Sequence, residues 1–221
     1  MSLTAHPSLS WLTREKRLPL VAILRGLTPQ EAAAVGHALV ESGFTALEVP
    51  LNRPGALQCI EILARTMPTE VLVGGGTMLS VSDVDAVHTA GGRLMVSPNC
   101  DVQVIARART LGMLCAPGIA TATEAFAALK AGAQILKLFP SEMVGLGGLK
   151  ALLSVLPAGT EVFPVGGITP QSMGPWIAAG ATGFGIGSQL YSPGTPASEV
   201  ATRAGLYATA WNAARSPVVM G

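Results

Sequence analysis

The chain has 221 residues, of which 49% are hydrophobic and 12% are charged, and its formal net charge is +1. This composition fits one domain with a large core and excludes a disordered chain, which needs low hydrophobicity and high net charge. The near-neutral charge also argues against a nucleic-acid or membrane-surface protein, which would carry a basic stripe. Because no apolar run approaches the ~18–20 residues of a membrane span, we expect neither a membrane nor a nucleic-acid partner.

The cysteines and the first residues of the chain bear on its location. Cys59, Cys100 and Cys115 are odd in number, widely spaced and free of any CxxC pattern. They favour a reducing compartment over a disulfide framework. The first residues also lack the apolar segment of a secretory signal. We therefore expect a cytoplasmic protein.

One theme repeats along the chain: a short apolar run, a break at Gly, Pro or Thr, and a stretch with helical spacing. The runs predict strands at residues 20–24, 46–49, 71–73, 94–96, 113–116, 135–139, 162–165 and 183–186. Most runs are apolar throughout, as expected of parallel strands that are buried on both faces. The eight units recur at roughly 20–30 residues, the size of one strand-helix pair.

Local signals mark where the helices between these runs begin and end. Thr28 with Glu31, and Thr121 with Glu124, have the spacing of a capping box, and Thr169 precedes a proline as a plain cap would. Five glycines close helical stretches, where a left-handed residue is favoured. They are Gly43, Gly91, Gly112, Gly132 and Gly180.

Strand-helix alternation counted to eight, with right-handed crossovers, predicts an α/β fold, a (β/α)8 TIM barrel. We expect one domain over residues 1–221, with one extra N-terminal helix before Leu18. A doubly wound open sheet is the alternative, which eight nearly equal units disfavour. In a barrel of this kind the active site lies at the carboxyl ends of the strands.

Lys137 is the one lysine that falls within a predicted strand, where leucines flank it on both sides. A lysine in an apolar run can be a strand residue whose amine reaches the rim. Alternatively, burial lowers the pKa of the amine, so that a useful fraction is neutral and nucleophilic near pH 7. Such an amine is suited to attack a carbonyl and form a Schiff base.

Glu48 ends the second apolar run, whereas most other acids fall in helical or capping positions. An unpaired carboxylate there would be costly, so it needs a partner or a proton. It could form a structural ion pair with Arg25 or Lys137. A general acid/base in the barrel mouth, serving the same substrate as Lys137, is the reading we favour.

Small residues follow the last two strands, as Gly166-Gly167 and as Gly187-Ser188. Loops in these positions commonly hold a phosphate on backbone N–H groups and a helix N-terminus. A third glycine loop, residues 74–76, precedes Thr77. It is either a tight turn or a close approach to substrate, with the Thr77 hydroxyl for a carboxylate or carbonyl.

The three histidines do not suit a metal site or a Ser-His-Asp triad. His6 lies in the N-terminal tail, and His37 and His88 lie within helical stretches away from the strand ends. We therefore expect no metal. The remaining candidates are an amine, a carboxylate and a phosphate cradle.

The chain resembles the KDPG/KHG aldolase family, the class I pyruvate-dependent aldolases, from about Leu18 to Trp211. The resemblance rests on ordered segments rather than on any one motif. They are AILRG at 22–26, LEVPLN at 47–52, VGGGT at 73–77, VSPN at 96–99, APG at 116–118, TATEA at 121–125, LKLFP at 136–140, VGGITP at 165–170 and GIGS at 185–188.

The resemblance implies a role for each matching position. Lys137 would form the Schiff base and Glu48 would shuttle protons. Three residues would shape the pyruvoyl end, namely Arg25, Thr77 and Pro98, and Phe139 would pack beside the lysine. The phosphate would be held by Gly166, Gly167, Gly187 and Ser188. The family also implies no cofactor, a small sugar-acid phosphate substrate with pyruvate as a product, and a homotrimer.

Two positions bear on the substrate. Phosphogluconate members of the family typically carry Thr before Gly-Gly and Arg four residues after the catalytic Glu, whereas this chain has Val165 and Asn52. With Arg25, these residues follow the galactonate pattern. We expect cleavage of 2-dehydro-3-deoxy-6-phosphogalactonate to pyruvate and glyceraldehyde 3-phosphate. A phosphogluconate or hydroxyglutarate aldolase, another phosphate-binding barrel such as an isomerase, and a non-catalytic sugar-phosphate sensor are the alternatives.

Overall fold

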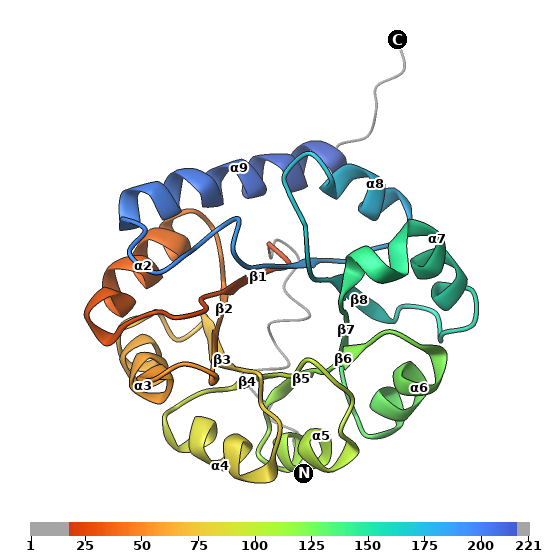
Figure 1. The fold of residues 1–221 in the computed structure, drawn as a ribbon, viewed down its shortest axis with the longest axis horizontal. Helices are drawn as coiled ribbons and strands as arrows, with labels where there is room; N and C mark the ends of the chain where they lie inside the picture. The colour runs from red at the N-terminus through yellow and green to blue at the C-terminus, as the bar shows by residue number, and fades with distance from the viewer. Residues whose placement is uncertain (1–17, 216–221) are drawn as a thin grey trace, which may run out of the picture.

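The computed structural model describes residues 18–215, in which strands and helices alternate along the chain (Figure 1). The helix expected before Leu18 lies outside the described residues. The strands are β1 (Leu20–Ile23), β2 (Ala46–Pro50), β3 (Leu72–Gly76), β4 (Leu94–Val96), β5 (Leu114–Ala116), β6 (Gly118–Ile119), β7 (Ile135–Leu138), β8 (Glu161–Pro164) and β9 (Phe184–Ile186). The helices are α2 (Pro29–Glu41), α3 (Ala56–Thr66), α4 (Val81–Thr89), α5 (Val102–Thr110), α6 (Ala122–Lys130), α7 (Ser141–Leu153), α8 (Met173–Ala178) and α9 (Ala197–Arg215).

The strands pair in parallel and curl around a common interior, with the helices outside (Figure 1). A six-stranded sheet has the order β5-β4-β3-β2-β1-β9, and a three-stranded sheet has the order β6-β7-β8. An isolated parallel bridge between Val165 and Gly185 connects the end of β8 to β9. The chain therefore has a parallel α/β fold, in which the carboxyl ends of all strands lie at the same end of the molecule.

Each of the eight predicted strands coincides with an observed strand, but two details were wrong. Strand β6 was not predicted: the fifth run ends at residue 116, and β6 follows β5 after one residue, Pro117. The carbonyl of Pro117 nevertheless accepts a hydrogen bond from the Lys137 N–H at 2.9 Å. The glycines at 74–76 belong to β3 rather than to a loop after it. A Cβ atom on Gly74 would lie 2.0 Å from the Leu94 carbonyl oxygen, so glycine lets β3 and β4 approach each other.

Burial on both faces of the strands explains why the predicted runs are apolar throughout. Alternate side chains of a strand point to opposite faces, and they divide here into two clusters. The larger cluster fills the space between strands and helices. The smaller, inner cluster consists of Val21, Ala46, Leu72, Leu94, Val96, Leu114, Ala116, Ile135 and Phe163, which come from seven different strands.

The helix boundaries follow the local signals, with one exception. Capping boxes at Thr28 and Thr121 are confirmed, and the five predicted glycines all have positive φ, between +70° and +107°. The predicted start at Thr169 was wrong, because α8 begins at Met173. Thr169 and Ser172 instead exchange hydrogen bonds in a turn, which satisfies the groups that a helix start would leave free.

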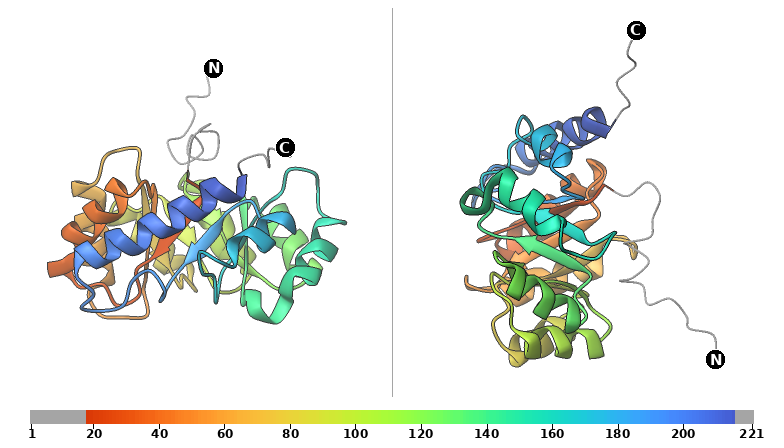
Figure 2. Two further views of the ribbon diagram at one scale, coloured as in Figure 1. Left: turned by 90° about the horizontal axis from the view of Figure 1, so that it is seen from above. Right: turned by 90° about the vertical axis from the view of Figure 1, so that its right-hand side faces the viewer.

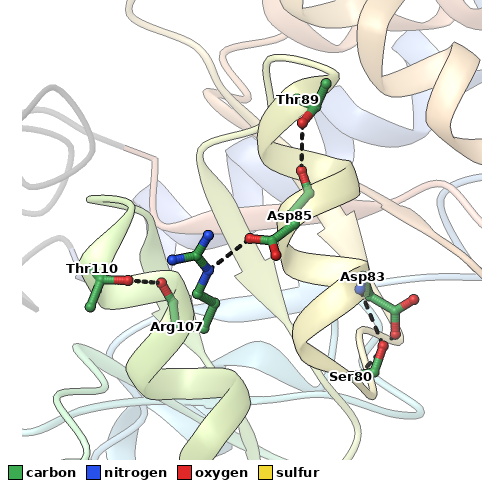
Figure 3. A network of polar contacts seen from close by, with 6 residues as sticks. All are labelled: Ser80, Asp83, Asp85, Thr89, Arg107 and Thr110. Carbon is green, nitrogen blue, oxygen red and sulfur yellow. Dashed lines mark hydrogen bonds and ion pairs between the residues drawn. The ribbon is translucent and has the colours of Figure 1, made fainter.

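The outer helices pack on one another as well as on the strands. Helix α9 crosses α2 and α8, and Figure 2 shows it lying along one side of the molecule. Helices α4 and α5 are joined by an ion pair between Asp85 and Arg107 at 2.7 Å (Figure 3). Within residues 18–215, no helix is both long and apolar enough to cross a membrane.

Candidate active site

Lys137 and Glu48 both project from the inner face of the curled sheets. Glu48 lies two residues after Ala46 in β2, and Lys137 lies two residues after Ile135 in β7. Because Ala46 and Ile135 belong to the inner cluster, the two-residue repeat of a strand directs Glu48 and Lys137 inward as well. The amine and the carboxylate therefore lie above the inner cluster, toward the carboxyl ends of the strands.

Lys137 is enclosed, since its side chain retains only 8% of its exposure. It lines a small inner cavity with Ile135 and Phe163, and its Nζ lies 4.7 Å from the centre of the Phe139 ring. Burial lowers the pKa of Lys137, the charge of Glu48 acts in the opposite direction, and that of Arg25 lowers it further. The fraction of neutral, nucleophilic amine is consequently larger than for an exposed lysine.

Glu48 is more deeply buried, at 1% exposure. Burial raises its pKa to about 7, against the opposing charges of Lys137 and Arg25. Among the described residues, its Oε2 has no hydrogen-bond partner. A Cβ atom on Gly76 would lie 2.0 Å from Oε1, so glycine at this position leaves room for the carboxylate. Glu48 is thus a carboxyl group that can both gain and lose a proton near neutral pH.

Arg25 follows β1 and is exposed. Its charge acts on both Lys137 and Glu48, so it lies within electrostatic reach of the pair. It also lines a second cavity, which is the larger cavity of the two that share Ile23, Val165 and Gly185. Arg25 therefore stands between the buried pair and the open cavity, and it can interact with an anionic group at either place.

The larger cavity has a volume of about 270 Å³ and adjoins Lys137 through three shared lining residues. These shared residues are Ile23, Val165 and Gly185. The volume lies near the lower end of the ~300–1,000 Å³ of small-molecule sites, which suits a compact ligand. Six predicted site residues line the cavity: Arg25, Phe139, Gly166, Gly167, Gly187 and Ser188.

The Gly166-Gly167 loop is supported from behind by the start of α7. The Ser141 hydroxyl donates a hydrogen bond to the Gly166 carbonyl at 2.7 Å. Side chains on either glycine would run into the Glu142 carboxylate, which lies 2.3 Å from a Cβ placed on Gly166. Both glycines also have positive φ, which favours glycine over any other residue.

Thr77 and Pro98 lie beside the buried pair rather than in the larger cavity. Thr77 follows Gly76 and has φ +53°, an uncommon conformation for a β-branched residue. Such strain is frequent at functional sites. Pro98 packs on Gly118, where a Cβ would lie 2.3 Å from the Pro98 carbonyl. Gly118 is paired with Lys137 in the sheet, so the Pro98 turn lies next to the lysine strand.

Sequence reasoning missed part of the cavity wall. Gln189, Tyr191, Ser192 and Pro193 line it from the segment that follows Ser188. The rule that loops after the last two strands form the phosphate site could have been extended to them. Gly76 was also missed, because only the folded chain shows which side chain its missing Cβ accommodates.

The arrangement combines an enclosed amine, a carboxyl group with a raised pKa and an adjoining cavity with glycine loops and an arginine. These are the groups needed for covalent catalysis on a carbonyl with proton transfer and a remote anion site. Within residues 18–215, no cluster of three His, Cys, Asp or Glu side chains is arranged to hold a metal ion.

Comparison with known protein families gives a match over most of the chain. The model described as KDPG and KHG aldolase covers residues 12–202. The chain is 46% identical over 206 residues to 2-dehydro-3-deoxy-6-phosphogalactonate aldolase of Escherichia coli (strain K12), covering 93% of this chain and 99% of that protein. It is 47% identical over 186 residues to the probable 2-dehydro-3-deoxy-6-phosphogalactonate aldolase of Rhizobium meliloti, with 84% and 88% covered.

Solved structures give the same picture. The structure described as native KDPGal is 46% identical, has a TM-score of 0.88, and aligns over 91% of this chain and 98% of that one. The 2-keto-3-deoxy-6-phosphogluconate aldolase of Zymomonas mobilis with 3-phosphoglycerate is 29% identical, with a TM-score of 0.78 over 86% of this chain and 91% of that one.

Proposed function

Because this chain belongs to the KDPG and KHG aldolase family, we propose that it is a class I aldolase that cleaves 2-dehydro-3-deoxy-6-phospho-D-galactonate. The products are pyruvate and D-glyceraldehyde 3-phosphate. One observation carries the assignment: a buried amine, Lys137, and a buried carboxyl group, Glu48, meet above the inner cluster beside a cavity of about 270 Å³.

Lys137 is the proposed nucleophile. Its neutral amine adds to the C2 ketone, and loss of water gives a protonated imine. The protonated imine withdraws electrons from the C3–C4 bond while Glu48, directly or through a water molecule, removes the proton of the C4 hydroxyl. The C3–C4 bond then breaks, which releases glyceraldehyde 3-phosphate and leaves the enamine of pyruvate on the lysine.

In the second half of the proposed cycle, Glu48 donates the proton that it removed in the first half. The carboxyl group returns a proton to C3 of the enamine, and hydrolysis of the imine frees pyruvate and Lys137. The group therefore acts first as a base and then as an acid, which is best served by a pKa near the working pH. The raised pKa of Glu48, about 7, supports this double role.

The rest of the predicted site serves binding in this proposal. The glycine loops hold the phosphate through Gly166, Gly167, Gly187 and Ser188. These four residues line the larger cavity together with Arg25 and Phe139. Thr77 and Pro98 shape the pyruvoyl end, next to Glu48 and the Lys137 strand. Contacts to the remote phosphate orient the reacting carbons over Lys137.

The choice of epimer rests on the relatives and on two residues. Identities of 46% and 47% to the two phosphogalactonate enzymes exceed the 30% to the 2-dehydro-3-deoxy-phosphogluconate aldolase of Treponema pallidum. Val165 lines the cavity where phosphogluconate members carry threonine. The apolar side chain of Val165 offers no hydroxyl group to the substrate.

We extend the proposal to the architecture and the assembly. The bridge from Val165 to Gly185 and the continuation of β5 into β6 support a closed eight-stranded barrel as one domain. A chain 46% identical to this one belongs to a cage designed by fusing symmetric oligomeric domains, which supports a symmetric oligomer, and the family resemblance implies that it is a homotrimer. Three free cysteines support a reducing, cytoplasmic setting.

Pyruvate release from the two epimers tests the function. We expect the purified protein to release pyruvate from the phosphogalactonate substrate faster than from its phosphogluconate epimer, at equal substrate concentrations. A clear preference for the gluconate epimer would reassign the substrate within the family. Absence of pyruvate from both epimers would contradict the aldolase assignment itself.

A further inference from the structure

Glu31 makes more contacts than the helix cap requires. It lies in the first turn of α2, where its Oε2 accepts hydrogen bonds from the Thr28 N–H at 3.3 Å and the Thr28 hydroxyl at 2.5 Å. The same oxygen accepts a bond from the Tyr191 hydroxyl at 3.3 Å, and Oε1 accepts one from the Gly194 N–H at 3.1 Å. Tyr191 and Gly194 lie at the opposite end of the chain.

The segment that Glu31 contacts forms a wall of the larger cavity. Gln189, Tyr191, Ser192 and Pro193 all line that cavity. Tyr191 is 1% exposed, so its ring is packed in place and its hydroxyl reaches Glu31. The position of this wall therefore depends on a carboxylate that lies outside the cavity.

The segment that carries Arg25 is pressed against the same wall. Gly26, with φ +79°, lies next to Arg25, and a Cβ atom on it would be 2.9 Å from Pro193. Arg25 lines the same cavity as the Gly166 loop. The Glu31 carboxylate accepts hydrogen bonds from Thr28, the last residue of the Arg25 segment (residues 25–28), and from Tyr191 in the segment 189–194. It is the described residue at which the two segments are tied together.

Helix α6 provides an internal comparison. Its capping box has the same construction, since Glu124 accepts bonds from the Thr121 N–H and hydroxyl. Its further bond comes from the neighbouring Ala120 N–H, so it serves only its own helix start. For both carboxyl groups these bonds lower the pKa, so both are ionised near neutral pH. The bonds to Tyr191 and Gly194 distinguish Glu31.

We propose that Glu31 is a positioning residue for the phosphate end of the substrate site, holding the Arg25 segment and the segment 189–194 at the separation that a bound phosphate requires. This inference rests on the proposed function. Glu31 touches no reacting atom. Its loss should therefore weaken binding of phosphorylated ligands and leave the chemistry at Lys137 unchanged.

The substitution Glu31→Gln tests the proposal, with Glu124→Gln as the matched control. Glutamine at position 31 has one accepting oxygen, so its NH2 group faces either the Gly194 N–H or the Thr28 N–H, neither of which can accept, and that bond is lost. We expect KM for the phosphorylated substrate to rise about tenfold in Glu31→Gln and by less than about twofold in Glu124→Gln. The rate of borohydride trapping with pyruvate, which carries no phosphate, should stay at the wild-type level in both.

Tyr191→Phe keeps the proposal testable if Glu31→Gln does not fold. This variant removes one hydroxyl bond and retains the ring, so we expect about a threefold rise in KM. The proposal is overturned if Glu31→Gln changes KM no more than Glu124→Gln does. It is equally overturned if kcat and pyruvate trapping fall together with the affinity, because Glu31 would then act on the whole site.

Direct binding of glyceraldehyde 3-phosphate, measured by calorimetry, separates this proposal from the aldolase assignment. Weaker binding in Glu31→Gln than in Glu124→Gln supports the positioning role even if neither epimer releases pyruvate. Failure of the wild-type protein to bind glyceraldehyde 3-phosphate at all would overturn the phosphate site and the role of Glu31 with it.

Discussion

The position of the Glu48 carboxylate requires a residue without a side chain in the neighbouring strand β3. Its carboxylate lies in the space that a side chain at Gly76 would fill, and Glu48 pairs with Gly74 in the sheet. The glycines of β3 therefore have separate structural reasons: Gly74 admits the neighbouring strand β4, and Gly76 admits a carboxylate. Neither reason can be inferred from the sequence alone, where three consecutive glycines are typical of a turn.

The substitution Gly76→Ala should displace the Glu48 carboxylate and leave Lys137 in place. We expect kcat to fall by about 100-fold or more, within the range of general acid-base catalysis, while pyruvate is still trapped on Lys137. Gly205→Ala is the control, because nothing lies within 4 Å of a Cβ at that position. A Gly76→Ala protein with wild-type kcat would show that Glu48 is not held by this contact.

Burial of Glu48 makes stability depend on pH. Its pKa is raised from 4.5 to about 7 in the folded protein, so the folded state binds the proton more tightly than the unfolded chain does. Stability linked to this group is present below pH 4.5 and is lost as pH rises through 7, by up to about 3 kcal/mol. Glu48→Gln cannot ionise and should remove this loss.

Denaturant unfolding at pH 5 and pH 8 measures this effect. Between the two pH values, the wild-type free energy of unfolding should fall relative to that of Glu48→Gln. Parallel pH dependences of the two proteins would mean that Glu48 ionises as readily when folded as when unfolded.

At the scale of elements, side-chain caps mark where four of the described helices begin, namely α2, α4, α5 and α6. The sequence predicted the boxes at Thr28 and Thr121, because a Thr followed by a Glu three residues later is a local pattern. It did not predict the third box, in which Ser80 accepts a bond from the Asp83 N–H (Figure 3). It wrongly placed a start at Thr169, since the same residue types also form turns.

The caps should stabilise the fold more than the surface ion pair between α4 and α5. Ser80→Ala removes a cap, and we expect the free energy of unfolding to fall by about 1 kcal/mol. Arg107→Ala breaks the pair with Asp85, whose two side chains are 42% and 46% exposed. Because solvent screens exposed pairs, we expect a loss below about 0.5 kcal/mol. Chemical denaturation compares the two, and a larger loss for Arg107→Ala would contradict this ranking.

At the scale of the whole molecule, the parallel topology explains how much the sequence could predict. Eight apolar runs located eight of the nine described strands, and the rule that sites lie at carboxyl ends singled out Lys137 and Glu48. Three-dimensional contacts supplied the rest. The bond from Tyr191 to Glu31 joins residues 160 positions apart, and no local pattern relates them. Residues that line the cavity could be inferred, whereas the contacts that support its wall from outside could not.

The whole fold also explains why, among the lysines of residues 18–215, only Lys137 is enclosed. Lys130 and Lys150 lie on outer helices and are exposed, whereas β7 carries Lys137 into the enclosed interior. The desolvation that lowers its pKa therefore arises from the curled arrangement of strands and helices around it and not from its neighbours in the chain.

Reductive trapping with pyruvate tests this account most directly. The protein is incubated with pyruvate and sodium borohydride near pH 7, digested, and analysed by mass spectrometry. The buried amine, whose pKa is lowered by desolvation, predicts one reduced pyruvate adduct per chain, on the peptide that contains Lys137, retained in Glu48→Gln and abolished in Lys137→Ala. An unmodified Lys137 peptide, or adducts spread over Lys130 and Lys150, would contradict it.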